Sequence, residues 1–238
     1  MVRPMLDLLL LVLVTSARGL NVVDVGASTA SKLLPFENKD SYFSSPPSFY
    51  GVFDGVSQCP ESRAYSQTLA KTCSAVLSSQ STTTDWNIQA QSALREATSA
   101  AGGYSGSSTA ILMRVDLDGD EPRLSTFCLG DCQILVLRSS EDNPGSLVVA
   151  DYSSVKFHEN GAPYQLGGKG WQSDVIEDGE FEDFALFAGD TVLCFSDGFA
   201  NNFDLDEVAV AVADCATLSA GDMAAKLVAE ARRCTWCT

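Results

Sequence analysis

Residues 48–55 read SFYGVFDG, and this segment says most about the fold of the chain. Aromatic and small residues alternate from Ser48 to Phe53, which is typical of a β-strand, and the strand stops at Asp54-Gly55. Two later apolar runs are also followed by an acidic residue, at Asp131 and at Asp197-Gly198. Each acid taken alone is compatible with an ordinary turn. Together with Asp40, these acids indicate a shared site for a hard divalent cation, which prefers carboxylate and carbonyl oxygens.

The rest of the chain alternates between helical and strand patterns. Apolar residues at three- and four-residue spacing predict helices over Ser62–Leu77, Asp85–Ala101 and Asp204–Ala213, and a last helix from Ser219. Short apolar runs predict antiparallel strands over Ser108–Val115, Arg123–Leu129, Gln133–Arg138, Ser146–Ala150 and Thr191–Ser196. We expect irregular structure before Asp40 and a solvated loop over the acid-rich residues 174–183. This order predicts a layered α+β domain.

Composition narrows the class of protein. The chain has 238 residues, of which 45% are apolar and 19% charged, so it is globular and long enough for one large domain. Its 31 acidic and 15 basic side chains give a formal net charge of −16. Such a surface repels phosphate backbones, so nucleic acid and anionic membranes are poor partners.

The N-terminus has the pattern of a targeting sequence. Arg3 precedes an apolar run over Leu8–Val14, and the small residues Ala17 and Gly19 fit a cleavage site. We therefore expect a signal peptide over residues 1–19, a domain over 20–238, and a mature form outside the membrane. Because Asp7 is unusual so close to an apolar run, an organellar transit peptide is the alternative. The expected location is the secretory pathway or an organelle (plastid or mitochondrion).

Eight cysteines are compatible either with disulfides or with buried thiols. Cys128, Cys132 and Cys194 lie in or beside apolar strands, which favours buried thiols. Cys234 and Cys237 form a single C-x-x-C pair, which is weak evidence for zinc binding or redox chemistry.

A series of short motifs carries a family resemblance. In order along the chain they are residues 26–28 (GAS), 38–43 (NKDSYF), 50–56 (YGVFDGV), 106–110 (GSSTA), 129–131 (LGD), 162–166 (APYQL), 189–190 (GD) and 195–199 (FSDGF). Over about Gly26 to Arg233, the chain resembles the metal-dependent type 2C protein serine/threonine phosphatases, and in particular the branch often found in mitochondria and plastids.

The resemblance implies a sandwich of two antiparallel sheets flanked by helices, with two Mg²⁺ or Mn²⁺ ions at one end. Asp54 would bridge the ions and Gly55 would offer its carbonyl to one of them. Asp197 would bind an ion directly, Asp40 would bind an ion or hold its waters, and Asp131 would serve a weak third site. Asp54 and Asp197 would be the catalytic residues.

Several positions depart from the family pattern. Lys39 stands where the family has an acid, Pro35 where many members have a phosphate-binding arginine, and Val56 where many have a histidine. Asn201 replaces an aspartate that often supports the third ion. The family closes with an acidic pair entering a last core strand, and residues 234–238 (CTWCT) lack it, so we expect that ligand and strand to be missing.

The resemblance implies hydrolysis of phosphoserine and phosphothreonine by a metal-bound water, with a phosphoprotein as the substrate. The missing terminal acid favours an alternative, a catalytically inactive phosphatase-like module that binds phosphoproteins or a regulatory partner. A third alternative is an unrelated disulfide-bonded extracellular domain. The first hypothesis requires Asp40, Asp54 and Asp197 to lie together in the fold.

Overall fold

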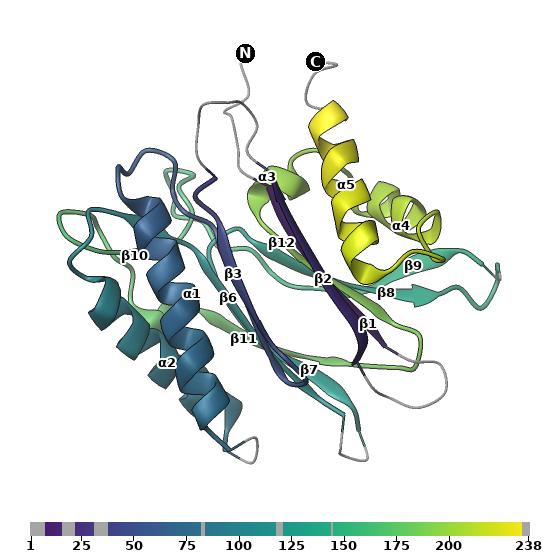
Figure 1. The fold of residues 1–238 in the computed structure, drawn as a ribbon, viewed down its shortest axis with the longest axis horizontal. Helices are drawn as coiled ribbons and strands as arrows, with labels where there is room; N and C mark the ends of the chain where they lie inside the picture. The colour runs from purple at the N-terminus through teal and green to yellow at the C-terminus, as the bar shows by residue number, and fades with distance from the viewer. Residues whose placement is uncertain are drawn as a thin grey trace.

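The computed structural model describes residues 8–15, 22–30, 38–81, 84–117, 121–143 and 145–234. Two antiparallel sheets pack against each other, and helices cover the outer face of each sheet (Figure 1). This confirms the α+β sandwich that the family resemblance implies.

The first sheet has the strand order β11-β7-β6-β4-β3. Its strands are β3 (Ser41–Ser45), β4 (Phe49–Phe53), β6 (Ala110–Asp116), β7 (Arg123–Leu129) and β11 (Glu180–Ala185). A separate short pair joins β5 (Ser107–Ser108) to β10 (Leu166–Gly167). Helices α1 (Ser62–Ser79) and α2 (Trp86–Ala101) cover the outer face of this sheet. Asp85 caps α2 by accepting a hydrogen bond from the Ile88 backbone N–H.

The second sheet has the order β2-β1-β12-β8-β9. Its strands are β1 (Leu8–Thr15), β2 (Val22–Ala30), β8 (Gln133–Ser139), β9 (Leu147–Tyr152) and β12 (Thr191–Phe195). The short helix α3 (Asp197–Ala200) follows β12, and α4 (Leu205–Ala213) and α5 (Ala220–Cys234) cover the outer face. Asp204 and Glu207 form the capping box expected at the start of α4.

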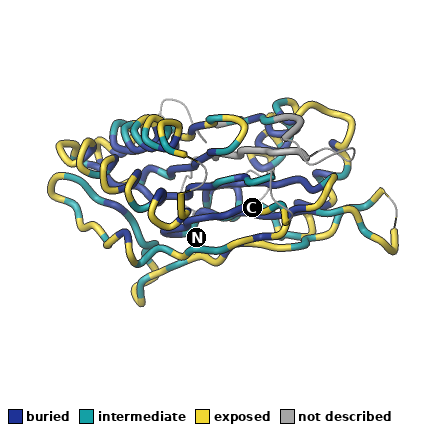
Figure 2. Tube along the Cα trace, turned by 90° about the horizontal axis from the view of Figure 1, so that it is seen from below, coloured by how far each residue is buried: buried dark blue, intermediate teal, exposed yellow. Residues whose placement is uncertain are grey.

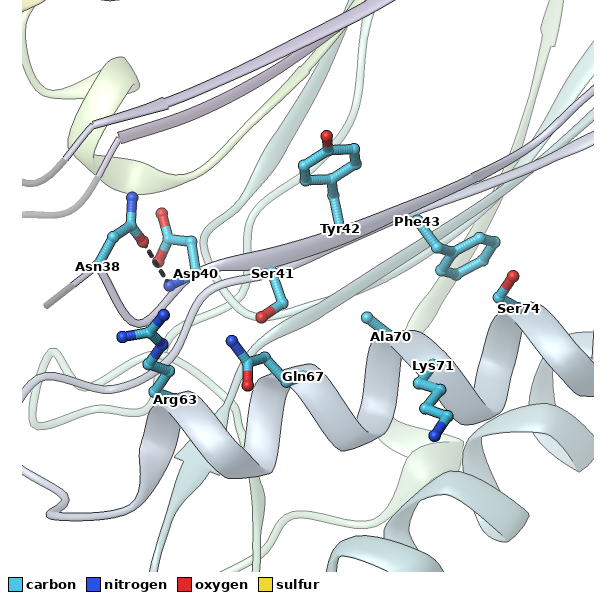
Figure 3. A pocket seen from close by; sticks show the side chains of 10 residues that line it. All are labelled: Asn38, Asp40, Ser41, Tyr42, Phe43, Arg63, Gln67, Ala70, Lys71 and Ser74. Carbon is cyan, nitrogen blue, oxygen red and sulfur yellow. Dashed lines mark hydrogen bonds between the residues drawn. The ribbon is translucent and has the colours of Figure 1, made fainter.

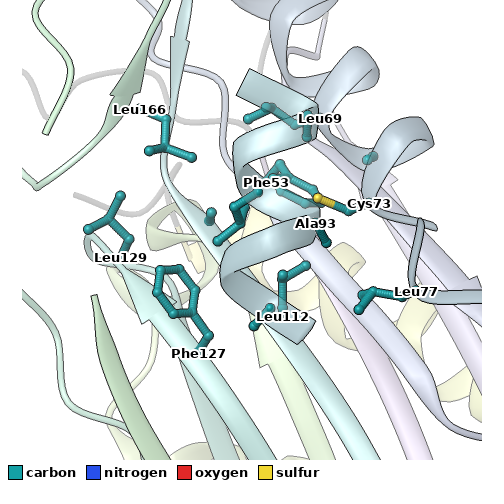
Figure 4. Close-up of a cluster of buried hydrophobic side chains, with 14 of the residues drawn as sticks. Phe53, Leu69, Cys73, Leu77, Ala93, Leu112, Phe127, Leu129 and Leu166 are labelled. Carbon is teal, nitrogen blue, oxygen red and sulfur yellow. The ribbon is translucent and has the colours of Figure 1, made fainter. Parts of the chain in front are cut away.

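Side chains alternate between the two faces of each strand, so the two sheets contribute to three layers of hydrophobic core. In β6, Ala110 and Leu112 face α1 and α2, while Ile111 and Met113 face the second sheet. Strands β8 and β12 alternate in the same way between the inner core and the core under α4 and α5. Figure 2 shows the buried residues concentrated in these inner layers. Figure 4 shows the outer core of the first sheet, in which Phe53 and Leu112 of the sheet belong to the same buried cluster as Leu69 of α1.

Two expectations of irregular structure are wrong. Val22–Ala30 forms β2, where the absence of a side chain at Gly26 lets the start of α5 approach closely. A Cβ atom at Gly26 would lie 2.1 Å from the Gly221 backbone nitrogen. Glu180–Asp183 belongs to β11, in which buried Phe184 anchors a charged strand at the edge of the sheet. Charged side chains are acceptable there because only β7 pairs with this strand.

The apolar run of the expected signal peptide forms β1. Leu11 pairs with Ala27 of β2 on one side and with Cys194 of β12 on the other. Residues 1–7 and 16–19 lie outside the described residues, and cleavage of a leader stays a prediction. Within the part of the chain described up to residue 234, no strand follows β12, which has β1 and β8 as its neighbours.

The six cysteines whose side chains are described are all buried and free: Cys59, Cys73, Cys128, Cys132, Cys194 and Cys215. They behave as small apolar residues, as the strand positions of three of them predict. Among the described residues, no helix combines the length and the apolar character that crossing a bilayer requires.

Candidate metal centre

Four acids from distant parts of the chain lie together at one edge of the sandwich. Asp54 follows β4, Asp131 lies between β7 and β8, Asp197 follows β12, and Asp40 precedes β3. The charges of Asp40, Asp131 and Asp197 all act on Asp54, and Asp197 shares a side-chain hydrogen bond with Asp54. The structure therefore brings together the four carboxylates singled out in the sequence.

The loop after β4 is shaped by close backbone contacts. The Asp54 carbonyl accepts a hydrogen bond from the Thr109 backbone N–H at 3.0 Å. Gly55 pairs with Ser108, and a Cβ atom at Gly55 would lie 2.4 Å from the Lys39 carbonyl oxygen. Only glycine fits this approach, which holds the loop after β4 against the residues before β3.

Asp40 is buried and oriented by two neighbours. Its backbone N–H donates to Asn38 Oδ1 at 2.7 Å. The Ser196 hydroxyl donates to Asp40 Oδ2 at 2.9 Å. Because Ser196 directly precedes Asp197, this bond ties the start of β3 to the end of β12. The sequence analysis missed Ser196, although its place beside a candidate ligand was a usable signal.

Crowding of the carboxylates shifts their protonation. Burial, followed by the charges of the neighbouring acids, raises the pKa of Asp54 well above its ordinary value. Burial and then the charge of Asp197 raise the pKa of Asp131 to about 7. The protein alone therefore disfavours four negative charges at this edge, and a bound cation would relieve that repulsion. A hard divalent cation fits a donor set of this kind.

Cys132, which the sequence predicts only as a buried thiol, adjoins the acids. One ligand atom each from Asp54, Asp131 and Cys132 lie within 4.8 Å of one another. The Cys132 thiol is buried and lies 3.2 Å from the Thr109 hydroxyl oxygen. Burial and then the charges of Asp54 and Asp131 raise the pKa of this thiol well above its ordinary value. The available signal was its position directly after Asp131 in the sequence.

The positions that depart from the family pattern have local roles. The Lys39 ammonium donates to the carbonyls of Ser57 and Cys59 at 2.7 Å each, and so holds the loop that leads into α1. Asn201 Nδ2 lies 3.4 Å from Asp197 Oδ2. Pro35 lies outside the described residues. The neighbouring charges that raise the pKa of Asp54 most come from Asp40, Asp197 and Asp131.

Comparison with known proteins gives matches among solved structures. No protein-family model matches the chain, and no curated protein matches its sequence. The photosystem II phosphatase PBCP has a TM-score of 0.64 at 23% identity, over 82% of this chain and 72% of that one. The Mycobacterium tuberculosis serine/threonine phosphatase PstP has a TM-score of 0.63 at 17% identity, over 97% and 94% of the two chains.

Stp1, a serine/threonine phosphatase from Staphylococcus aureus, has a TM-score of 0.63 at 12% identity, over 84% of this chain and 85% of that one. Identities at this level establish the shared fold. The motif order, the two-sheet sandwich and these structural matches agree, and the chain has the fold of the type 2C serine/threonine phosphatases.

Proposed function

We propose that the chain is a metal-dependent protein phosphatase that hydrolyses phosphoserine and phosphothreonine. The observation that carries the proposal is the convergence of Asp40, Asp54, Asp131 and Asp197 at one edge of the sandwich. Four crowded carboxylates are costly in a protein without a cation, so their convergence favours a metal centre over four unrelated turns. The fold shared with known phosphatases agrees with this assignment.

The residues have distinct roles in the proposal. Asp54 is the central ligand, because the other three acids all act on it. Asp197 is its hydrogen-bonding neighbour, Asp40 is held in place by Ser196, and Asp131 serves a weaker outer site. The Gly55 carbonyl is a further oxygen donor. Mg²⁺ and Mn²⁺ both suit these oxygens, and two ions with a weak third are proposed.

A divalent cation at this centre would supply the Lewis acidity that activates water and would neutralise the charge of the phosphoryl group. The protein's own contribution is to hold the acids in place before substrate arrives. Backbone hydrogen bonding at Asp54, the close approach at Gly55 and the Ser196 bond to Asp40 provide that order. No phosphorylated enzyme is needed, because the acids position the attacking water and do not attack phosphorus themselves.

Turnover of p-nitrophenyl phosphate and of a phosphoserine peptide tests the proposal. We expect hydrolysis with Mn²⁺ or Mg²⁺ and none with EDTA. Asp54→Asn keeps the size and turn preference of the residue, yet it removes the charge of a central ligand. We expect a fall in kcat/KM of at least about a hundredfold, or roughly 2.7 kcal/mol of barrier.

The matched control is Asp142→Asn, which changes an exposed acid in the loop between β8 and β9 and should retain full activity. Absence of turnover by the unaltered chain at every metal concentration would contradict the proposed phosphatase activity. Peptide binding without turnover would instead support the inactive phosphatase-like module. Full activity of Asp54→Asn would show that Asp54 is a turn residue and not a central metal ligand.

The partner and the location remain part of the proposal. We propose that the substrate is a phosphoprotein. We also propose a location in the secretory pathway or in a plastid or mitochondrion, and only the N-terminal pattern supports this location. Detection of a fluorescently tagged full-length chain in intact cells tests the location.

A further inference from the structure

A groove of about 490 Å³ lies between β3 and α1, next to the candidate metal centre (Figure 3). Asp40 belongs both to the groove and to the cluster of acids. Tyr42 lines the groove from β3, and Arg63 and Lys71 line it from α1. A molecule held at the acids would therefore continue into this groove.

The α1 side of the groove is a polar stripe. Arg63, Gln67 and Lys71 follow one another at four-residue intervals, so they lie on one face of the helix, and all three are exposed. The opposite face of α1 is buried through residues such as Leu69 and Cys73. Lys71 follows Arg63 by eight residues, so the Cα atoms of the two residues lie about 12 Å apart along the helix axis.

The groove is locally cationic although the chain as a whole is acidic. The chain has a net charge of −16, yet two cationic side chains line the groove. Among the described lining residues Asp40 is the only acid, and it belongs to the metal centre. Figure 3 shows Arg63 extending toward the end of the groove where Asn38 and Asp40 lie. Lys71 lies about two turns farther along α1, and in this view its ammonium group points away from Tyr42 and β3.

We propose that this groove binds the substrate segment that flanks the phosphorylated residue, and that Arg63 and Lys71 select an acidic segment. The inference rests on the proposed phosphatase function for the position of the phosphorylated residue. Charge complementarity supports it, because a peptide with acidic side chains meets two cations beside the candidate metal centre, on a chain whose net charge is −16. Arg63 and Lys71 are specificity residues in this account, and the acids remain the catalytic centre.

The geometry also sets the position of the acidic residue. An extended peptide advances about 3.3 Å per residue, so the helical spacing of about 12 Å between Arg63 and Lys71 corresponds to about four residues. With the phosphorylated residue at the Arg63 end, Lys71 meets a side chain about four positions away. Acidic residues at that distance should therefore matter more than acids farther along the peptide.

The test uses three phosphoserine peptides of equal length that differ only in carrying Glu, Gln or Lys four positions on either side of the phosphoserine. We expect the Glu peptide to have the highest kcat/KM with Mn²⁺, through a lower KM, and the Lys peptide the lowest. Because exposed ion pairs are weak, each cation should account for about a two- to fivefold preference. Lys71→Ala should reduce the ratio of the Glu to the Gln peptide. Arg63→Ala should reduce this ratio less, because Arg63 lies at the end of the groove that holds the phosphorylated residue.

Charge reversal should create a new preference for the Lys peptide, and a variant that merely fails to fold would not show this preference. A chain with both Arg63→Glu and Lys71→Glu should favour the Lys peptide over the Glu peptide. Arg233→Ala and Lys226→Ala are the matched controls, because they remove the same charges from exposed or partly exposed positions on α5, which covers the other sheet. They should keep the preference of the unaltered chain. Equal kcat/KM for all three peptides, or equal losses in the controls, would overturn the inference.

The experiments distinguish failure of the proposed phosphatase function from failure of the proposed peptide binding in the groove. If no peptide is hydrolysed by the unaltered chain, the proposed function has failed, and fluorescence anisotropy of the labelled peptides then measures binding in the same buffers. Tighter binding of the Glu peptide that depends on Arg63 and Lys71 would still support the groove. Equal binding of the three peptides would overturn it.

Discussion

The two sheets differ in how far apart along the chain their paired strands lie. In the first sheet, β3 pairs with β4 across a short turn, and β6 pairs with β7 in the same way. In the second sheet, β1 near the N-terminus lies between β2 and β12, so that Leu11 pairs with Cys194. The candidate metal centre includes acids next to strands of both sheets. One wall of the site is therefore ordered by pairing within the middle of the chain, whereas the other wall also requires a strand pair formed by segments near the two ends of the described chain.

Removal of residues 1–19 tests this difference with the largest expected effect. The deletion removes β1 and leaves β2 and β12 without their shared partner. Unpaired backbone groups in a covered sheet are costly, so we expect a loss of about 5 kcal/mol or more. Thermal unfolding followed by circular dichroism should show a transition lowered by more than about 10 °C, or none at all.

An unchanged transition in the shortened chain would show that the domain folds without β1. That result would favour the signal-peptide interpretation, in which this segment is removed in the mature protein. The N-terminal residue of the protein isolated from cells, determined by mass spectrometry, would then identify the cleavage site.

Gly26→Ala tests the contact between β2 and α5. The new methyl group would lie 2.1 Å from the Gly221 backbone nitrogen, so one of the two elements must move. We expect a loss of about 1 to 3 kcal/mol in the free energy of unfolding, measured by urea titration. The control is Gly103→Ala after α2, where no atom lies within 4 Å of the added carbon. Equal stabilities for the two variants would show that the approach of α5 to β2 is not tight.

The pH dependence of stability without metal gives a smaller effect. Because the pKa of Asp131 is raised to about 7 in the folded protein, the folded state holds a proton that the unfolded state has lost above pH 4. Stability in EDTA should therefore fall as pH rises from about 4 to 7, and this fall should be shallower for Asp131→Asn. Asp142→Asn is expected to follow the unaltered chain. Parallel curves for Asp131→Asn and the unaltered chain would contradict the crowding of the acids.

Much of the first sheet could be predicted because its signals are local. The strand at residues 48–53, the spacing of α1 and the Asp85 cap all depend on neighbours in sequence. In the second sheet, β2 escaped prediction because its clearest feature, the place of Gly26 against α5, involves residues about two hundred positions away. The charged residues of β11 resemble a loop until Phe184 is seen in the core.

The candidate site was predictable in part for the same reason. Acids at strand ends pointed to Asp54, Asp131 and Asp197, with Asp40 considered beside them, and the ordered motifs agreed with this set. The supporting contacts could not be predicted from the sequence. Ser196 donates to Asp40, a residue far away in the sequence. Cys132 comes close to Asp54 only when β6 pairs with both β4 and β7. Motifs thus identified the charged groups, and tertiary contacts identified what orients them.

Metal-induced stabilisation of the unaltered chain and of Asp54→Asn tests the central claim most directly. A ligand that binds the folded state at a hundred times its Kd adds about 2.7 kcal/mol, which corresponds to a rise in Tm of roughly 5 to 10 °C. We predict a rise of this size when saturating Mn²⁺ replaces EDTA, and less than about 2 °C for Asp54→Asn. An equal rise in both proteins, or none in the unaltered chain, would contradict a metal centre built around Asp54.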